Sequence, residues 1–229
     1  MTKIKNKDNI TLLHNTVIFM GDEFMSENGH NTKQSICEAA CEEFLEKGYQ
    51  AASLRRIVQK AGVTTGAFYG YYKSKEELFS ALVEEEYNYI IDLYNKILYK
   101  FTQLEPEQQR DDMQDYTAIG MNNMISYMYD HKVAFKLILC CSVGTKYDHF
   151  IHDLAEMDIK ATHDFSETME NAGVTMKSVN PQLEHMITSG MFSAFSEMIV
   201  HDIPQEESGE YIRQLLDFYT AGWQKIMGF

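Results

Sequence analysis

Apolar residues recur at helical spacing along almost the whole chain, and this periodicity constrains the fold more than any other feature of the sequence. No segment alternates apolar and polar residues as a strand would, and no internal repeat is present. Only three prolines occur in 229 residues, so long helices are permitted almost everywhere. We therefore expect an all-α fold in which about nine helices with short connections form a bundle.

Capping and breaking residues predict where these helices begin and end. A capping-box-like start at Asn31 and Gln34 predicts a helix from about Thr32 to Lys47, with Gly48 as its stop. Thr64 and Ser74 are good N-caps for two later helices. The helices after the first are expected at about 54–61, 65–72, 74–101, 107–130, 132–143, 146–172, 181–201 and 206–227.

The first 30 residues precede this helical pattern, and we expect them to form a poorly ordered extension. Their semi-apolar stretch is interrupted by His14 and Asn15 and lacks a cleavage site, so a signal peptide is not expected. No apolar run approaches the roughly 20 residues that cross a membrane, and we expect a cytoplasmic protein without membrane contact. The rest of the chain is predicted to divide into a helix-turn-helix domain at 31–78 and a second helical domain at 79–229.

Charge is distributed unevenly along the chain. The formal net charge of −14 by itself argues against a nucleic-acid partner. Residues 31–75, however, carry seven basic and four acidic side chains, whereas residues 76–229 carry ten basic and 26 acidic ones. Within residues 50–75 every charged side chain is basic, namely Arg55, Arg56, Lys60, Lys73 and Lys75. We therefore expect DNA contact at one basic end of an acidic molecule, because lysine and arginine replace counterions condensed on phosphates.

The segment SLRRIVQKAGVTTGAFYGYYKSK, residues 53–75, has the organisation of a helix-turn-helix. Gly62 permits the sharp turn between its two short helices, and Val63 fills the angle between them. The second helix can enter a major groove with its N-terminus first. Its residues expected at base edges are Thr65, Gly66 and Tyr69.

Four aromatic residues and a lysine follow the turn. Phe68 and Tyr72 are four residues apart and should pack inward. Tyr69 and Tyr71 should point outward, where their hydroxyls can bond to bases or phosphates. Lys75 opposes the dipole of the helix that it opens, which is explained if a phosphate shares that helix N-terminus. The alternative, a helical hairpin packed in a core, explains neither the acid-free stretch nor the turn chemistry.

On these residues the chain resembles the N-terminal DNA-binding domain of the TetR family of repressors. The resemblance covers about a fifth of the chain, within residues 32–80. It is specific because the turn, the aromatic cluster and the lysine fall in register. The matching segments are Ser53-Leu54-Arg55-Arg56-Ile57, Ala61-Gly62-Val63-Thr64, Gly66, Phe68-Tyr69-Gly70-Tyr71-Tyr72 and Lys73-Ser74-Lys75-Glu76-Glu77-Leu78-Phe79.

The resemblance implies roles for individual residues. Arg55, Thr65 and Tyr69 fall where bases or grooves are contacted, and Ser53, Tyr71 and Lys75 fall where phosphates are bound. Thr64 and Gly66, at the start of the second helix, are added to these six residues to give the expected DNA-binding set. Gly70 departs from the bulky residue often found at its position, which puts one contact in doubt. The second helix also lacks Arg, Asn and Gln, so direct base discrimination should be modest.

The resemblance further implies a repressor that dimerises through its last two helices and binds a palindromic double-stranded DNA operator. A dimer also follows from DNA recognition, since one small module binds weakly and symmetric half-sites multiply the contacts. Small Gly190 and Ala194 would let a partner helix approach, and the last helix is apolar on more than one face. The alternative is that the apolar faces of the last two helices pack only within one chain.

TetR-like proteins use their second domain to bind a small effector that releases the operator. Methionine and aromatic stripes suit an adaptable cavity for an apolar or aromatic ligand, although such stripes are more often plain core. The residues expected to line it are Tyr87, Ile91, Tyr94, Met121, Met124, Met128, Phe135, Leu139, Phe150 and Leu154.

Other chemistry is less well supported. Cys140 and Cys141 could sense oxidants, but one core residue and one pocket-wall residue is the more ordinary interpretation. His149 and His152 could share a metal with Asp153 or His163, although exposed or core histidines are commoner, so no metal or cofactor is predicted. No catalytic motif predicts an enzyme. The alternatives to a DNA-binding regulator are a redox sensor or a helical small-molecule-binding protein without DNA function.

Overall fold

The structure is a computed structural model that describes residues 27–228. Over this range the chain forms α-helices and one short π-helix, with no β-strand, as the helical periodicity predicts. Most of the extension expected at residues 1–30 lies outside the described residues. None of the described helices combines the length and apolar composition needed to cross a membrane.

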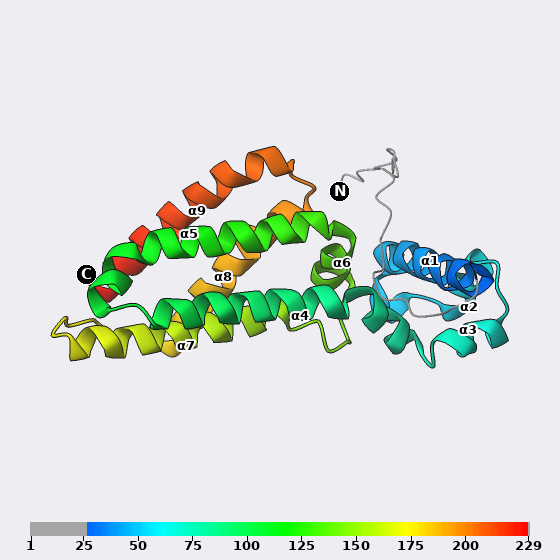
Figure 1. The fold of residues 1–229 in the computed structure, drawn as a ribbon, viewed down its shortest axis with the longest axis horizontal. Helices are drawn as coiled ribbons and strands as arrows, with labels where there is room; N and C mark the ends of the chain where they lie inside the picture. Colours follow the sequence, from blue (N-terminus) through cyan, green and yellow to red (C-terminus); the bar gives the residue numbers. More distant parts are fainter. Residues whose placement is uncertain (1–26, 229) are drawn as a thin grey trace, which may run out of the picture.

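Three helices form one end of the elongated molecule (Figure 1): α1 (Glu27–Ala51), α2 (Leu54–Lys60) and α3 (Thr65–Tyr71). Their shared core contains Ile36, Phe44, Ile57 and Phe68, all fully buried. Helix α1 begins five residues before the expected start at Thr32. Gly48 does not end it but kinks it, with φ 71° and ψ 163°, and one further turn follows.

Helix α4 (Lys75–Thr102) leads from the three-helix end into the rest of the molecule (Figure 1). Its start is fixed as expected, because the Ser74 hydroxyl accepts a hydrogen bond from the Glu77 amide at 3.0 Å. The Glu77 carboxylate accepts in return from the amide of Lys73 at 2.6 Å. The first turns of α4 bury Leu78 and Phe79 in the core of the three-helix end.

The remaining helices form a bundle with α4 in which α9 runs alongside α5 (Figure 1). Pro106 opens α5 behind a capping box of Glu105 and Gln108, and Asn180 caps the start of α8. The bounds differ from the expected ones by a few residues. They are α5 (Pro106–Asp130), α6 (Lys132–Lys136), the π-helix η1 (Leu137–Cys141), α7 (Phe150–Asn171), α8 (Pro181–Val200) and α9 (Gln205–Met227).

The two parts of the molecule share one continuous core. Tyr49 at the end of α1 packs edge-on against Phe79 of α4, with ring centroids 5.3 Å apart, and Phe79 contacts Tyr147 at 6.1 Å. Helix α1 packs on η1, the widened turn that replaces the second half of the helix expected at 132–143. Movement of the bundle can therefore reach the three-helix end through packed side chains.

Candidate nucleic-acid interface and ligand cavity

The turn between α2 and α3 has the geometry that its sequence predicts. Gly62 has φ 68°, the left-handed region that glycine adopts without strain. The Thr64 hydroxyl accepts a hydrogen bond from the Ala67 amide at 3.1 Å and caps α3. Phe68 and Tyr72 are buried against α1, where the Tyr72 hydroxyl lies 3.1 Å from the Cys37 sulfur.

Most of the expected DNA-contacting residues of α2, the turn and α3 are open to solvent. Tyr69 is 54% exposed, with its ring edge-on to Phe68 at 5.3 Å. Ser53, at the N-cap of α2, is half-buried. A helix N-terminus with exposed small polar groups can approach a major groove closely. The exposed members of the set are Arg55, Thr64, Thr65, Gly66 and Tyr69.

Lys75 has partners other than the expected phosphate. Its ammonium donates to the carbonyl oxygens of Tyr49, Gln50 and Ala52 at 2.6, 3.2 and 3.0 Å, and it lies 4.5 Å from the centre of the Tyr49 ring. These carbonyls form the negative end of α1, so a lysine is favoured there without a phosphate. Burial also lowers the pKa of Lys75. Lys75 thus joins the start of α4 to the end of α1.

Tyr71 also differs from its expected outward position. Its side chain is half-buried and packs against the core of the three-helix end. In a seven-residue helix that buries Phe68 on one side, the residue three positions later lies near the same side. The exposed face of α3 therefore carries Tyr69 as its aromatic residue, and Tyr71 lies at its edge.

The stretch of residues 50–75 lacks acids in the sequence, but in space α1 supplies them. Glu43 is 4% exposed, and its carboxylate accepts from the Ser53 amide at 2.8 Å and from Arg56 at 2.7 and 3.0 Å. Lys60 of α2 pairs with Glu42, which also lies on α1. The four cations Arg55, Arg56, Lys60 and Lys73 are all exposed. Arg56 and Lys60, however, form ion pairs with acids of α1, so the basic patch is weaker than its composition suggests.

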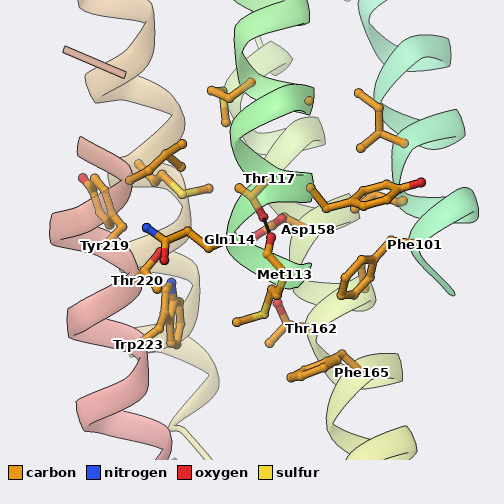
Figure 2. Close-up of a pocket in the computed structure, with 18 of the residues that line it drawn as sticks. Phe101, Met113, Gln114, Thr117, Asp158, Thr162, Phe165, Tyr219, Thr220 and Trp223 are labelled. Carbon is orange, nitrogen blue, oxygen red and sulfur yellow. Dashed lines mark hydrogen bonds between the residues drawn. The ribbon is translucent and has the colours of Figure 1, made fainter. Parts of the chain in front are cut away.

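A cavity of about 150 Å³ opens in the bundle between α4, α5, α7, α8 and α9, away from the three-helix end. Figure 2 shows Tyr219, Thr220 and Trp223 of α9 on one side and Phe101 of α4 on the other. Its wall is mostly apolar and aromatic, with a few polar groups, as in small-molecule sites. The lining includes Ile97, Leu98, Met113, Gln114, Tyr116, Thr117, Gly120, Asp158, Ala161, Thr162, Phe165, Met191, Leu216 and Met227.

The expected ligand-binding residues coincide with this cavity only in part. Tyr94 and Met121 line it. The others lie nearer the three-helix end, where several of them are almost fully buried in the packed core. The helical periodicity identified which faces of these helices point inward, but it did not identify where along the bundle the cavity lies. The residues outside the lining are Tyr87, Ile91, Met124, Met128, Phe135, Leu139, Phe150 and Leu154.

Asp158 is the acidic group of the cavity wall, and it was absent from the residues expected there. It lies on α7 and accepts a hydrogen bond from the hydroxyl of Tyr94 on α4. Burial among protein atoms raises the pKa of Asp158 to about 6, although the Tyr94 hydroxyl opposes that shift. A buried carboxyl beside aromatic rings suits a ligand that offers a hydrogen-bond donor or a positive charge.

The cysteines and histidines are arranged differently from the sequence-based alternatives. Cys140 is exposed and Cys141 buried, and burial raises the pKa of both thiols, that of Cys141 to about 11. Such thiols are poorly ionised at neutral pH, which disfavours the redox-sensor alternative. His149 lies 3.1 Å from Asp148, and its ring centroid is 6.4 Å from that of His152.

Comparison with known proteins supports the interpretation of the three-helix end. Residues 36–82 match the family described as bacterial regulatory proteins, TetR family. The Transposon Tn10 TetC protein of Escherichia coli is 46% identical over 68 residues, which cover 30% of this chain and 34% of that protein. The transcriptional repressor AcnR of Corynebacterium efficiens is 39% identical over 56 residues, 24% of this chain and 30% of AcnR. Each match thus spans about a third of the relative's length.

The fold as a whole is shared with solved structures of low sequence identity. The TetR-family regulator PfmR from Thermus thermophilus has a TM-score of 0.51 and 20% identity, over 80% of this chain and 97% of PfmR. The regulator FadR from Bacillus subtilis has a TM-score of 0.50 and 15% identity, over 82% and 98%. Both proteins are named as transcriptional regulators. Residues 36–82 therefore carry the N-terminal domain of the TetR family of bacterial regulatory proteins, and the chain as a whole shares its fold with the two structures named above.

Proposed function

We propose that the protein is a homodimeric transcriptional repressor that binds a palindromic operator through α3 and releases it when a small molecule enters the bundle. The observation that carries this proposal is the capped, glycine-turned α3, whose exposed face holds Thr65, Gly66 and Tyr69. Arg55 on α2 adds an exposed cation beside that face. A regulator of this kind acts on DNA in the cytoplasm.

Exposed apolar side chains on α8 and α9 support the dimer. Phe218 of α9 is 71% exposed and Met186 of α8 is 63% exposed, which is costly in water unless a second surface covers them. Leu183, Tyr211 and Ile226 add to the exposed apolar surface of the same two helices. Many other apolar residues of α8, by contrast, are buried within the chain, including Met191, Phe195, Met198 and Ile199.

The cavity lining supports an effector with an apolar or aromatic body and a single donor group. Phe101, Phe165 and Trp223 offer rings to such a body, and Asp158 can accept from its donor. Because α4 contributes both to the cavity and to the base of the three-helix end, a ligand can favour a different spacing of the two α3 helices in the dimer. A ligand that binds both spacings equally would leave operator affinity unchanged.

Gel shift and fluorescence anisotropy with the DNA that flanks the protein's own gene test the DNA-binding part. We expect Arg55→Ala to weaken binding and to lower the salt slope by about one, because one positive charge held against the DNA groove, which displaces a condensed counterion, is lost. Lys96→Ala removes an exposed lysine on the bundle part of α4 and is the matched control, with an unchanged slope. The absence of any specific shift at low salt would favour the alternative, a ligand-binding helical protein without DNA function.

A further inference from the structure

A cluster of two histidines and one glutamate bridges α7 and α8 on the outside of the bundle. His152 and Glu156 are four residues apart and therefore share a face of α7, and His185 lies near the start of α8. One ligand atom from each of the three residues lies within 4.8 Å of the other two. We propose that these three side chains bind a divalent transition-metal ion of the zinc class.

The orientation of His185 favours metal binding. Its Nε2 lies 3.3 Å from the hydroxyl of Ser189, one turn further along α8. When Nε2–H donates to that hydroxyl, Nδ1 carries the lone pair, and Nδ1 is the atom that lies 3.3 Å from Glu156 Oε1. A hydrogen bond from the second ring nitrogen is the usual support of a metal-bound histidine.

The dimensions of the cluster fit a tetrahedral ion after small side-chain rotations. Zinc–nitrogen and zinc–oxygen bonds of about 2.0–2.2 Å separate neighbouring ligand atoms by about 3.4 Å. His185 and Glu156 are already at that separation, and the His152 ring centroid lies 5.2 Å from that of His185. Two imidazoles and one carboxylate leave a fourth position for water. Mg²⁺ and Ca²⁺ prefer oxygen ligands and are disfavoured.

The other histidine–acid contacts of the described chain lack this convergence. His201 pairs with Glu197 on its own helix, and His163 pairs with the buried Glu184. Each of these is a two-residue contact, whereas the cluster of His152, Glu156 and His185 gathers three donors from two helices. Both His152 and Glu156 are exposed, so an ion can reach them from solvent.

Occupancy of the site would crosslink α7 to α8. Asp158, the acid of the cavity, lies two residues beyond Glu156 on α7, and α8 carries the exposed Met186 next to His185. A bound ion would therefore hold together one helix that lines the cavity and one helix of the proposed dimer surface. The metal site itself depends on neither DNA binding nor an effector.

Metal titration of the full chain, stripped with chelator, tests the proposal. A Cys140→Ser background removes the exposed thiol as a competing ligand. We expect one Zn²⁺ per protomer with a dissociation constant on the order of 10 µM or tighter, a rise in melting temperature, and tetrahedral d–d absorption when Co²⁺ replaces Zn²⁺. Mg²⁺ should produce none of these effects.

Matched variants distinguish this site from adventitious binding. His152→Ala and His185→Ala should each weaken Zn²⁺ binding at least tenfold, and Ser189→Ala about tenfold, whereas His201→Ala should leave it unchanged. Melting temperatures in chelator must match the parent, which separates lost ligation from lost folding. Absence of binding at about 100 times the expected constant overturns the proposal. Binding that survives His152→Ala and His185→Ala, or that requires Cys140, overturns it as well.

Discussion

The buried carboxyl of the cavity makes a measurable contribution to stability. Burial raises the pKa of Asp158 to about 6 from an ordinary value of 3.8. Because the pKa is higher in the folded chain, ionisation of Asp158 opposes folding above pH 6, and this cost disappears as the pH falls through 6 toward 3.8. A difference of about two pKa units corresponds to at most about 3 kcal/mol at pH 8.

Asp158→Asn removes the charge and keeps an oxygen that accepts from the Tyr94 hydroxyl. We expect the free energy of unfolding to rise by about 3 kcal/mol at pH 8 and by roughly half that amount at pH 5. Urea denaturation followed by circular dichroism, at one protein concentration, measures both values. Because the variant is neutral at both pH values, only the parent's ionisation changes between them.

Asp153→Asn is the matched control. Asp153 also lies on α7 and accepts from a tyrosine of α4, Tyr87, but it is outside the cavity lining. Comparison of the two variants therefore tests whether the gain belongs to the carboxyl in the cavity wall rather than to any tyrosine-bonded aspartate of α7. A gain from Asp158→Asn that is the same at pH 5 and pH 8, or a loss at pH 8, would refute the reasoning that burial of the carboxylate is the cause.

Three further predictions concern the three-helix end. Lys75→Met should lower the free energy of unfolding by about 2 kcal/mol, because the carbonyl oxygens at the end of α1 lose the ammonium that donates to them. The salt slope of DNA binding should stay unchanged; a slope lowered by one with unaltered stability would place Lys75 on a phosphate. Gly70→Ala should stabilise the protein by up to about 1 kcal/mol in thermal unfolding, because the added Cβ meets open space on α3. Gly62→Ala should destabilise the protein by about 1–2 kcal/mol, because Gly62 has a positive φ. Equal effects of the two substitutions would contradict this reasoning. Glu43→Gln should cost about 2 kcal/mol by weakening the charged contact to Arg56, and an unchanged urea midpoint would argue against it.

The sequence predicted the helices and the turn well because their signals are local. Thr64 and Ser74 cap the helices that they were expected to cap, and Gly62 has the positive φ that the turn requires. Each of these features depends on hydrogen bonds or backbone angles within a few residues. The family resemblance depends on the same short segment and was confirmed by comparison.

The parts that the sequence did not predict depend on contacts between distant segments. Lys75 binds carbonyls more than 20 residues earlier in the chain, and Glu43 reaches Arg56 across the packing of α1 on α2. The cavity is lined by residues from five different helices, and the periodicity of one helix does not record how the others pack against it. A polar signal was nevertheless present, because Asp158 lies among inward-facing residues of α7. An acid on an apolar stripe can be sought in a sequence.

Because Lys75 is hydrogen-bonded to the last carbonyls of α1, a tilt of α4 is transmitted to α1. At 1.5 Å per residue, about 28 Å separate Lys75 from Tyr94 at the cavity. A tilt of α4 by about 5° around the cavity would displace its first turn by about 2.5 Å, and α1 must follow because its end is bonded to that turn. In the proposed dimer, two such displacements in opposite directions would change the distance between the two α3 helices by about 5 Å, compared with a major-groove width of about 12 Å.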